Sequence, residues 1–151
     1  MDTAIEVQYG IEDGTLPSAN QLICWAKAAL ADRRPNAEMT IRIVDEAEMA
    51  DYNARYRGKE GPTNVLSFDY EPMPGVELPL IGDLLICATV VEREALQQNK
   101  TSDAHWAHIV IHGTLHLLGF DHVEPAEAIV METLETTILA QLGYSNPYLE
   151  D

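Results

Sequence analysis

The most informative segment of the sequence is His112-Gly113-Thr114-Leu115-His116-Leu117-Leu118-Gly119-Phe120-Asp121-His122. Residues four apart lie on one face of a helix, so a helix through this segment would point His112 and His116 in the same direction. Glycine adopts the left-handed conformation that ends a helix without a steric penalty, so Gly119 is expected to end this helix and reverse the chain. The reversal would bring His122 back toward the other two histidines.

Three imidazoles at this spacing predict a site for one metal ion. Neutral imidazole suits zinc, and nickel, copper and iron accept the same ligand. Three protein ligands leave the fourth position of a tetrahedral zinc ion to water, as in catalytic zinc sites. We therefore expect His112, His116 and His122 to bind one Zn²⁺ ion and His112 to belong to the catalytic centre.

Three further side chains near this segment have two interpretations each. Asp121 either orients a ligand imidazole or the bound water, or it caps the following turn. His105 and His108 lie on the same helical stripe as His112. They either support the site or contact substrate, or they pack beneath the sheet.

The histidine spacing is also that of metzincin metalloproteases, in which a glutamate follows the first histidine. That glutamate is the general base that activates the zinc-bound water. Gly113 stands at this position here and accepts no proton, which argues against a protease. Met131 offers a counterpart to the metzincin methionine turn, but we expect it to pack in the core. It lies in an apolar helical stripe with Ile129, Val130, Leu134 and Ile138.

The remaining patterns predict four strands and five helices in a single domain over residues 1–151. Alternating or β-branched runs predict strands at 5–9, 39–44, 64–68 and 81–87. Periodicity and capping residues predict helices from 16–18 to about 34, where Pro35 follows, and over 46–56, 89–99, 102–118 and 125–142. Gly143 is expected to end the last helix. Together these elements predict an α+β fold, with helices on a small mixed sheet and a zincin-like site on a helix and its following turn.

The composition indicates a soluble protein of the cytoplasm. No apolar run approaches the roughly 20 residues needed to span a bilayer. The N-terminus, Met1-Asp2-Thr3-Ala4-Ile5-Glu6, has no feature of a secretion signal. Cys24 and Cys87 lie in apolar stretches without CxxC spacing, and we expect buried free thiols in a reducing compartment.

The formal net charge of −16 argues against non-specific nucleic-acid binding, because backbone phosphates attract lysine and arginine. All nine basic residues lie between Lys27 and Lys100, and three of them occur in Arg55-Tyr56-Arg57-Gly58-Lys59. An anionic substrate would therefore meet a small local patch and the metal.

Two long motifs closely resemble the YbeY family of bacterial endoribonucleases. One is the segment 112–122, and the other is Tyr56-Arg57-Gly58-Lys59-Glu60-Gly61-Pro62-Thr63-Asn64-Val65-Leu66-Ser67-Phe68. Gly82-Asp83-Leu84-Leu85-Ile86-Cys87 and Leu142-Gly143-Tyr144 also look like that family, so the resemblance covers nearly the whole chain.

The resemblance implies a metal-dependent, single-strand-specific endoribonuclease that acts in 16S ribosomal RNA 3′-end maturation and ribosome quality control. The family's metal-binding histidines match His112, His116 and His122, and its functionally important arginine matches Arg57. The implied partners are single-stranded ribosomal RNA, ribosomal small-subunit proteins and ribosome-assembly factors, with no membrane.

The residue chemistry is compatible with this activity. A zinc ion lowers the pKa of its bound water toward ~7 and polarises a phosphoryl oxygen. Arg57 offers a planar fork for a phosphate, and Lys59 adds a point charge. Both water and the RNA 2′-hydroxyl are compatible nucleophiles. The alternatives are a metalloprotease and a non-catalytic ribosome-assembly factor, whose metal is structural and whose acidic surface docks basic ribosomal proteins.

Overall fold

Four strands form one mixed sheet in the order β1-β2-β4-β3 within the described residues, which are 4–11, 16–31, 33–34, 36–69, 80–121 and 123–148 of the computed structural model. β1, β2 and β4 run parallel, whereas β3 pairs antiparallel with β4 and forms one edge of the sheet. The strand bounds are Ala4–Tyr9 for β1, Glu38–Val44 for β2, Val65–Asp69 for β3 and Leu80–Cys87 for β4.

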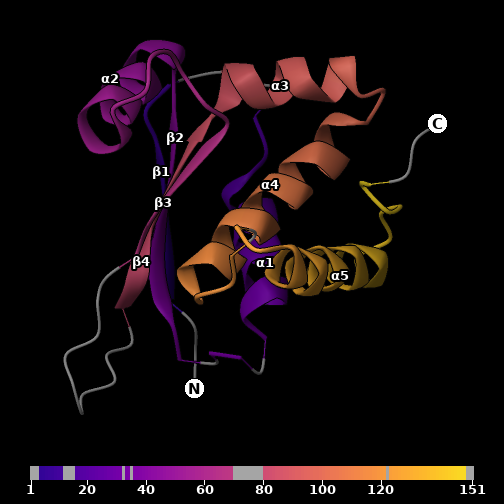
Figure 1. Cartoon of the computed structure of the whole chain (residues 1–151). Helices are drawn as coiled ribbons and strands as arrows, with labels where there is room; N and C mark the ends of the chain where they lie inside the picture. Colours follow the sequence, from indigo (N-terminus) through magenta and orange to yellow (C-terminus); the bar gives the residue numbers. More distant parts are fainter. Residues whose placement is uncertain are drawn as a thin grey trace.

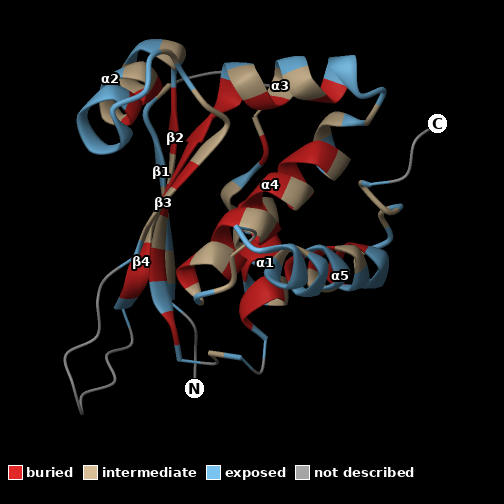
Figure 2. Cartoon of the chain, viewed as in Figure 1, coloured by how far each residue is buried: buried red, intermediate tan, exposed pale blue. Residues whose placement is uncertain are grey.

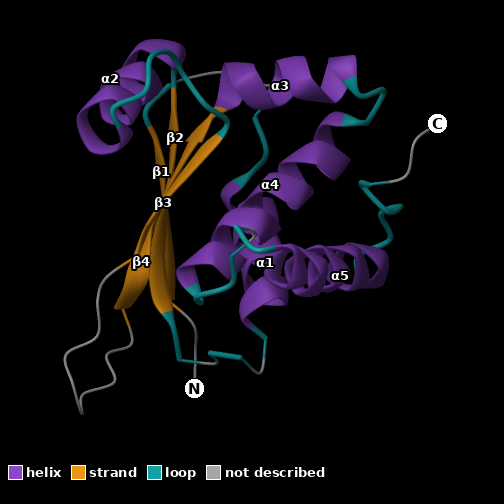
Figure 3. Ribbon diagram, in the orientation of Figure 1, coloured by secondary structure: helices purple, strands orange, loops and turns teal. Residues whose placement is uncertain are grey.

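Helices cover both faces of this sheet (Figures 1 and 3). α1, α4 and α5 lie on one side, and α2 lies on the other. The helix bounds are Ala19–Leu30 for α1, Glu46–Arg57 for α2, Ala88–Gln97 for α3, Ser102–Leu117 for α4 and Pro125–Gln141 for α5. The predicted α+β fold, with a four-stranded mixed sheet and five helices, is confirmed.

The hydrophobic core is divided by the sheet. The larger cluster lies under α1, α4 and α5, and includes Leu22, Ile41, Leu84, Trp106 and Leu115. The smaller cluster lies under α2, and consists of Val44, Met49, Leu66, Leu85 and Cys87. Successive side chains of a strand point to opposite faces, so β3 contributes Val65 to one cluster and Leu66 to the other.

α4 is the most buried helix of the fold (Figure 2). It begins where the Thr101 side chain accepts a hydrogen bond from the Ala104 N–H. It ends as predicted, because Gly119 has a φ of +101°. The Gly119 N–H donates to the His116 carbonyl (3.0 Å) and the Phe120 N–H to the Leu115 carbonyl (3.1 Å), which is the Schellman arrangement. Gly143 ends α5 in the same way.

The predicted end of the first helix, near residue 34, is wrong. α1 ends at Leu30, and Ala31 follows with a φ of +36°. The N–H groups of Arg33 and Arg34 both donate to the Leu30 carbonyl, so the chain turns here instead of continuing the helix. Pro35, which was expected to end the helix, lies outside the described residues.

Two predictions of burial also need correction. Cys24 is exposed, because α1 turns Leu22, Trp25 and Ala26 toward the core and Cys24 away from it; Cys87 is buried as predicted. Met131 and Ile138 are buried in the core as expected. Ile129 and Val130 are exposed, because the buried stripe of α5 is narrow and passes through Met131, Glu135, Ile138 and Leu139.

None of the described helices is both long enough and apolar enough to span a bilayer.

Candidate active site

A cleft of about 460 Å³ lies between the C-terminal end of α2, the beginning of β3 and one face of α4. It brings Arg57 together with His112 and His116, which are distant from it in the sequence. The half-buried Asp121 also lines it. The remaining lining residues are Thr63, Asn64, Val65, Leu66, Ser67 and Val123.

The first two predicted metal ligands lie side by side on α4. The ring centroids of His112 and His116 are 4.8 Å apart and their planes cross at 79°. Within the described residues, no group of three or more histidine, cysteine, aspartate or glutamate side chains is placed to hold a metal. The predicted third ligand, His122, lies outside the described residues, so its role stays a prediction.

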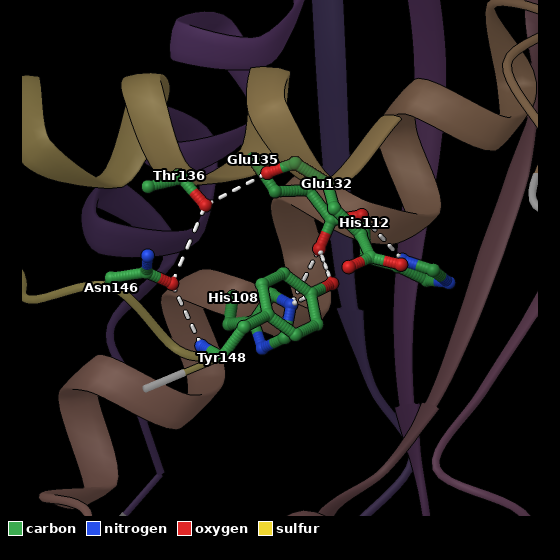
Figure 4. A network of polar contacts seen from close by, with 7 residues as sticks. All are labelled: His108, His112, Glu132, Glu135, Thr136, Asn146 and Tyr148. Carbon is green, nitrogen blue, oxygen red and sulfur yellow. Dashed lines mark hydrogen bonds and ion pairs between the residues drawn. The ribbon is translucent and has the colours of Figure 1, made fainter. Parts of the chain in front are cut away.

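Glu135, a buried carboxylate that the sequence did not predict, contacts the ring of His112 (Figure 4). Glu135 of α5 is fully buried, and its Oε2 lies 2.9 Å from His112 Nδ1. Its Oε1 lies 2.6 Å from His108 Nε2 and accepts a hydrogen bond from the Tyr148 hydroxyl at 2.5 Å. Glu135 therefore joins α4, α5 and the segment after α5.

The environment of Glu135 keeps it ionised. Burial disfavours the charged form, but the hydrogen bonds from His108, His112 and Tyr148 outweigh burial and lower the pKa of Glu135 to about 2. Burial and the neighbouring carboxylate raise the pKa of Tyr148, so its hydroxyl stays a donor. A carboxylate only accepts hydrogen bonds, which places the proton of neutral His112 on Nδ1 and the lone pair on Nε2.

A sequence signal for Glu135 existed. Its position shares the helical stripe of Met131, Ile138 and Leu139, and a glutamate is almost never fully buried unless it is paired. A charged residue within an apolar stripe therefore marks a buried polar contact.

The other two histidines of α4 also have carboxylate partners, of which Glu135 is buried and Glu94 is half-buried. His108 Nε2 contacts Glu135, the carboxylate that also contacts His112. His105 Nε2 lies 2.9 Å from Glu94 Oε1 of α3, and burial lowers the pKa of His105.

Arg57 is the last residue of α2 and extends into the cleft. Gly58 follows with a φ of +66°, and its N–H donates to the Ala54 carbonyl, so the helix stops directly after Arg57. The Asn53 side chain donates to the Gly61 carbonyl (2.8 Å) and holds the next loop in place. No ion pair joins Arg57 to another described residue. Lys59 is exposed and lies outside the cleft lining, so the structure does not bring it to the histidines.

The family described as Endoribonuclease YbeY matches residues 11–143 of the chain. The chain belongs to the YbeY family. It is also similar to the solution structure of TM1509 from Thermotoga maritima, with a TM-score of 0.59 and 22% sequence identity over 92% of this chain and 91% of that chain. This second likeness establishes a shared fold.

The packing at Gly113 explains why this YbeY chain has no room for the glutamate that serves as general base in metzincins. A Cβ atom at Gly113 would lie 2.8 Å from Leu84 Cδ2 and 3.2 Å from Val65 Cγ2, so the position faces the sheet and not the cleft. The Ser67 hydroxyl donates to the Gly113 carbonyl at 3.2 Å, which ties α4 to β3. A glutamate at this position would have to displace the core.

The described donor set of this YbeY site suits a transition metal ion. The imidazoles of His112 and His116 are adjacent, and in the neutral ring of His112 the Glu135 contact leaves the lone pair on Nε2. Metal-binding histidines usually donate their other ring N–H to a carboxylate or carbonyl, which orients the ring and raises the basicity of the ligand nitrogen. Glu135 provides that acceptor.

Proposed function

We propose that this protein is a metal-dependent, single-strand-specific endoribonuclease that acts in 16S ribosomal RNA 3′-end maturation and ribosome quality control. Its family is one of endoribonucleases with a role in ribosomal RNA maturation. The observation that carries the proposal is the cleft that contains Arg57 from α2 together with His112 and His116 from α4.

His112, His116 and His122 would hold one ion, with Zn²⁺ as the proposed metal. When bound, such an ion supplies a water of lowered pKa and polarises a phosphoryl oxygen. Glu135 holds His112 in the required tautomer and orientation. Asp121 lines the same cleft and would orient a ligand imidazole or the bound water.

Arg57 would bind the phosphate of the scissile bond. Its guanidinium is permanently charged and presents parallel N–H donors to two phosphate oxygens. Phosphoryl transfer depends mainly on positioning and charge neutralisation. Arg57 therefore contributes to this cleft by positioning the phosphate and neutralising its charge, and not as a general base.

The net charge of −16 bears on how RNA reaches the site. Most of the surface repels a polyanion, so productive contact depends on Arg57 at the cleft and on the metal. Basic ribosomal small-subunit proteins, with ribosome-assembly factors, are the proposed partners, since an acidic surface attracts them and places the cleft near RNA. The proposed location is the cytoplasm.

The test combines metal analysis with cleavage of single-stranded ribosomal RNA by wild type, His116→Ala, Arg57→Ala and a matched control, Arg55→Ala. Arg55 is exposed, pairs with Asp51 and does not line the cleft. We expect His116→Ala to lose both metal and cleavage, Arg57→Ala to keep metal and lose cleavage, and Arg55→Ala to behave as wild type.

Two outcomes would reject the proposal. A metal-loaded wild type that leaves single-stranded RNA intact would reject direct catalysis. A folded Arg57→Ala protein that rescues a deletion strain fully would favour the non-catalytic assembly factor.

A further inference from the structure

A second cavity, of about 310 Å³, adjoins the cleft along α4. Asn64 and His112 line both hollows, so they meet at a proposed metal ligand. The second cavity extends from His112 past His108 and His105 toward α3 and the segment after α5. The site is therefore longer than the cleft that contains Arg57.

Each hollow has one cation. Arg57 lines the cleft and Lys100 lines the second cavity, and no other lysine or arginine is among the described residues that line either. Lys100 lies in the loop directly before α4, whose N-terminal N–H groups carry partial positive charge. The two basic side chains therefore lie on either side of the histidines, in a protein whose formal net charge is −16.

Polar side chains that contact one another line the second cavity. Glu94 accepts from the Asn64 side chain (3.2 Å) and lies 2.9 Å from His105 Nε2. Its negative charge would repel a phosphate and suits the N–H groups on the edge of a nucleobase. A phosphate would therefore bind Lys100, the one cation among the described residues that line this cavity, although Glu94 partly offsets its charge.

Tyr148 provides an aromatic surface in the same cavity. Its hydroxyl donates to Glu135, and its backbone N–H donates to the Asn146 side chain at 2.8 Å, so the ring is held in one orientation. The residue is nevertheless 43% exposed. Single-stranded nucleic acids stack their bases on exposed aromatic side chains, and a ring of fixed orientation suits this contact.

We propose that the second cavity binds the nucleotide next to the cleaved bond, with a phosphate at Lys100 and a base on the Tyr148 ring. The inference rests on the proposed endoribonuclease function. It gives a physical reason for single-strand specificity, since a base held in a duplex is stacked and paired and cannot enter a recessed pocket.

The test measures binding of a labelled, single-stranded 2′-O-methyl RNA by fluorescence anisotropy at several salt concentrations, with gels to show that the strand stays intact. Lys100→Ala should weaken binding about fivefold and reduce the slope of log affinity against log salt by about 0.7, the value for one lost phosphate contact. Tyr148→Leu should weaken binding about tenfold, whereas Tyr148→Phe keeps the ring and most of the affinity. Lys27→Ala, on the exposed side of α1, is the control and should bind as wild type.

The outcomes separate this inference from the function on which it rests. If wild type binds the strand and cleaves unmodified RNA, but Lys100→Ala and Tyr148→Leu keep its affinity and salt slope, the second subsite is refuted and the nuclease stands. If wild type neither binds nor cleaves RNA, both are refuted. Metal content, measured for each variant, shows that a loss of binding does not arise from a damaged metal site.

Discussion

Glu135→Gln tests whether the buried carboxylate orients His112. The substitution keeps the shape of the side chain but replaces one acceptor oxygen by an NH₂ donor. Three donors now converge on the carboxylate, from His108, His112 and Tyr148. An amide cannot accept from both sides, so either His112 or the His108–Tyr148 pair must rearrange. If the amide nitrogen faces His112, the proton of that ring moves to Nε2, the nitrogen assigned to the metal.

The expected losses of metal affinity and of stability follow from this contact. Loss of the group that orients a ligand histidine costs about 10–100-fold in metal affinity, or about 1.4–2.8 kcal/mol. The unpaired buried polar groups should also lower the free energy of unfolding by about 1–3 kcal/mol.

Competition with a chromophoric zinc chelator measures the affinity, and urea denaturation of the metal-free protein measures the stability. Glu127→Gln is the matched control, because Glu127 lies on the same helix and is exposed. We expect it to leave both quantities unchanged. Equal zinc affinity of Glu135→Gln and wild type, with both proteins folded, would refute the positioning role of Glu135.

Four further predictions follow from contacts described above. Gly113→Glu should lower the free energy of unfolding by at least about 3 kcal/mol in chemical denaturation and give no peptidase activity, because its side chain would enter the core beside Leu84; a stable variant that cleaves casein would contradict this. Arg57→Lys should lower kcat/KM for RNA at least about tenfold, since it keeps the charge but loses the fork, while Arg55→Lys does not; equal rates would exclude bidentate binding. Because the pKa of Glu135 is lowered from 4.5 to about 2, its contribution to stability is complete above pH 4.5 and is lost as the pH falls toward 2. Denaturation at several pH values should therefore show that the free energy of unfolding falls less steeply with acid in Glu135→Gln than in wild type. The same fall in both proteins would argue against the ionised carboxylate. In thiol titration of the native protein, the exposed Cys24 should react at once and Cys87 only after unfolding, because Cys87 is buried and burial raises its pKa; rapid reaction of both would show that the core opens readily.

The sequence predicted the elements that depend on local patterns. α4 and its glycine end are encoded within about twenty consecutive residues, because periodicity and the left-handed turn are properties of neighbouring residues. The end of α1 was not predictable in this way. It depends on a turn at Ala31 that uses the Leu30 carbonyl, and alanine carries no signal for a positive φ.

The candidate site was predicted in part. Arg57 was placed beside the histidines by the family resemblance, since no local pattern reports a contact between the end of α2 and the middle of α4. Glu135 was missed because α5 was judged by its apolar residues alone. For the same reason Ile129 and Val130 were assigned to the apolar stripe of Met131, although α5 packs through a stripe that excludes them.

The link from Glu135 to His112 has a consequence for the order in which the protein matures. A polypeptide is made from its N-terminus, so Arg57, His112 and His116 exist before Glu135 and Tyr148 do. A chain interrupted between residues 123 and 134 would carry every proposed ligand and still lack the acceptor that orients His112. The proposed metal site therefore becomes complete only after α5 has been made and docked, and premature termination leaves a set of ligands without their alignment.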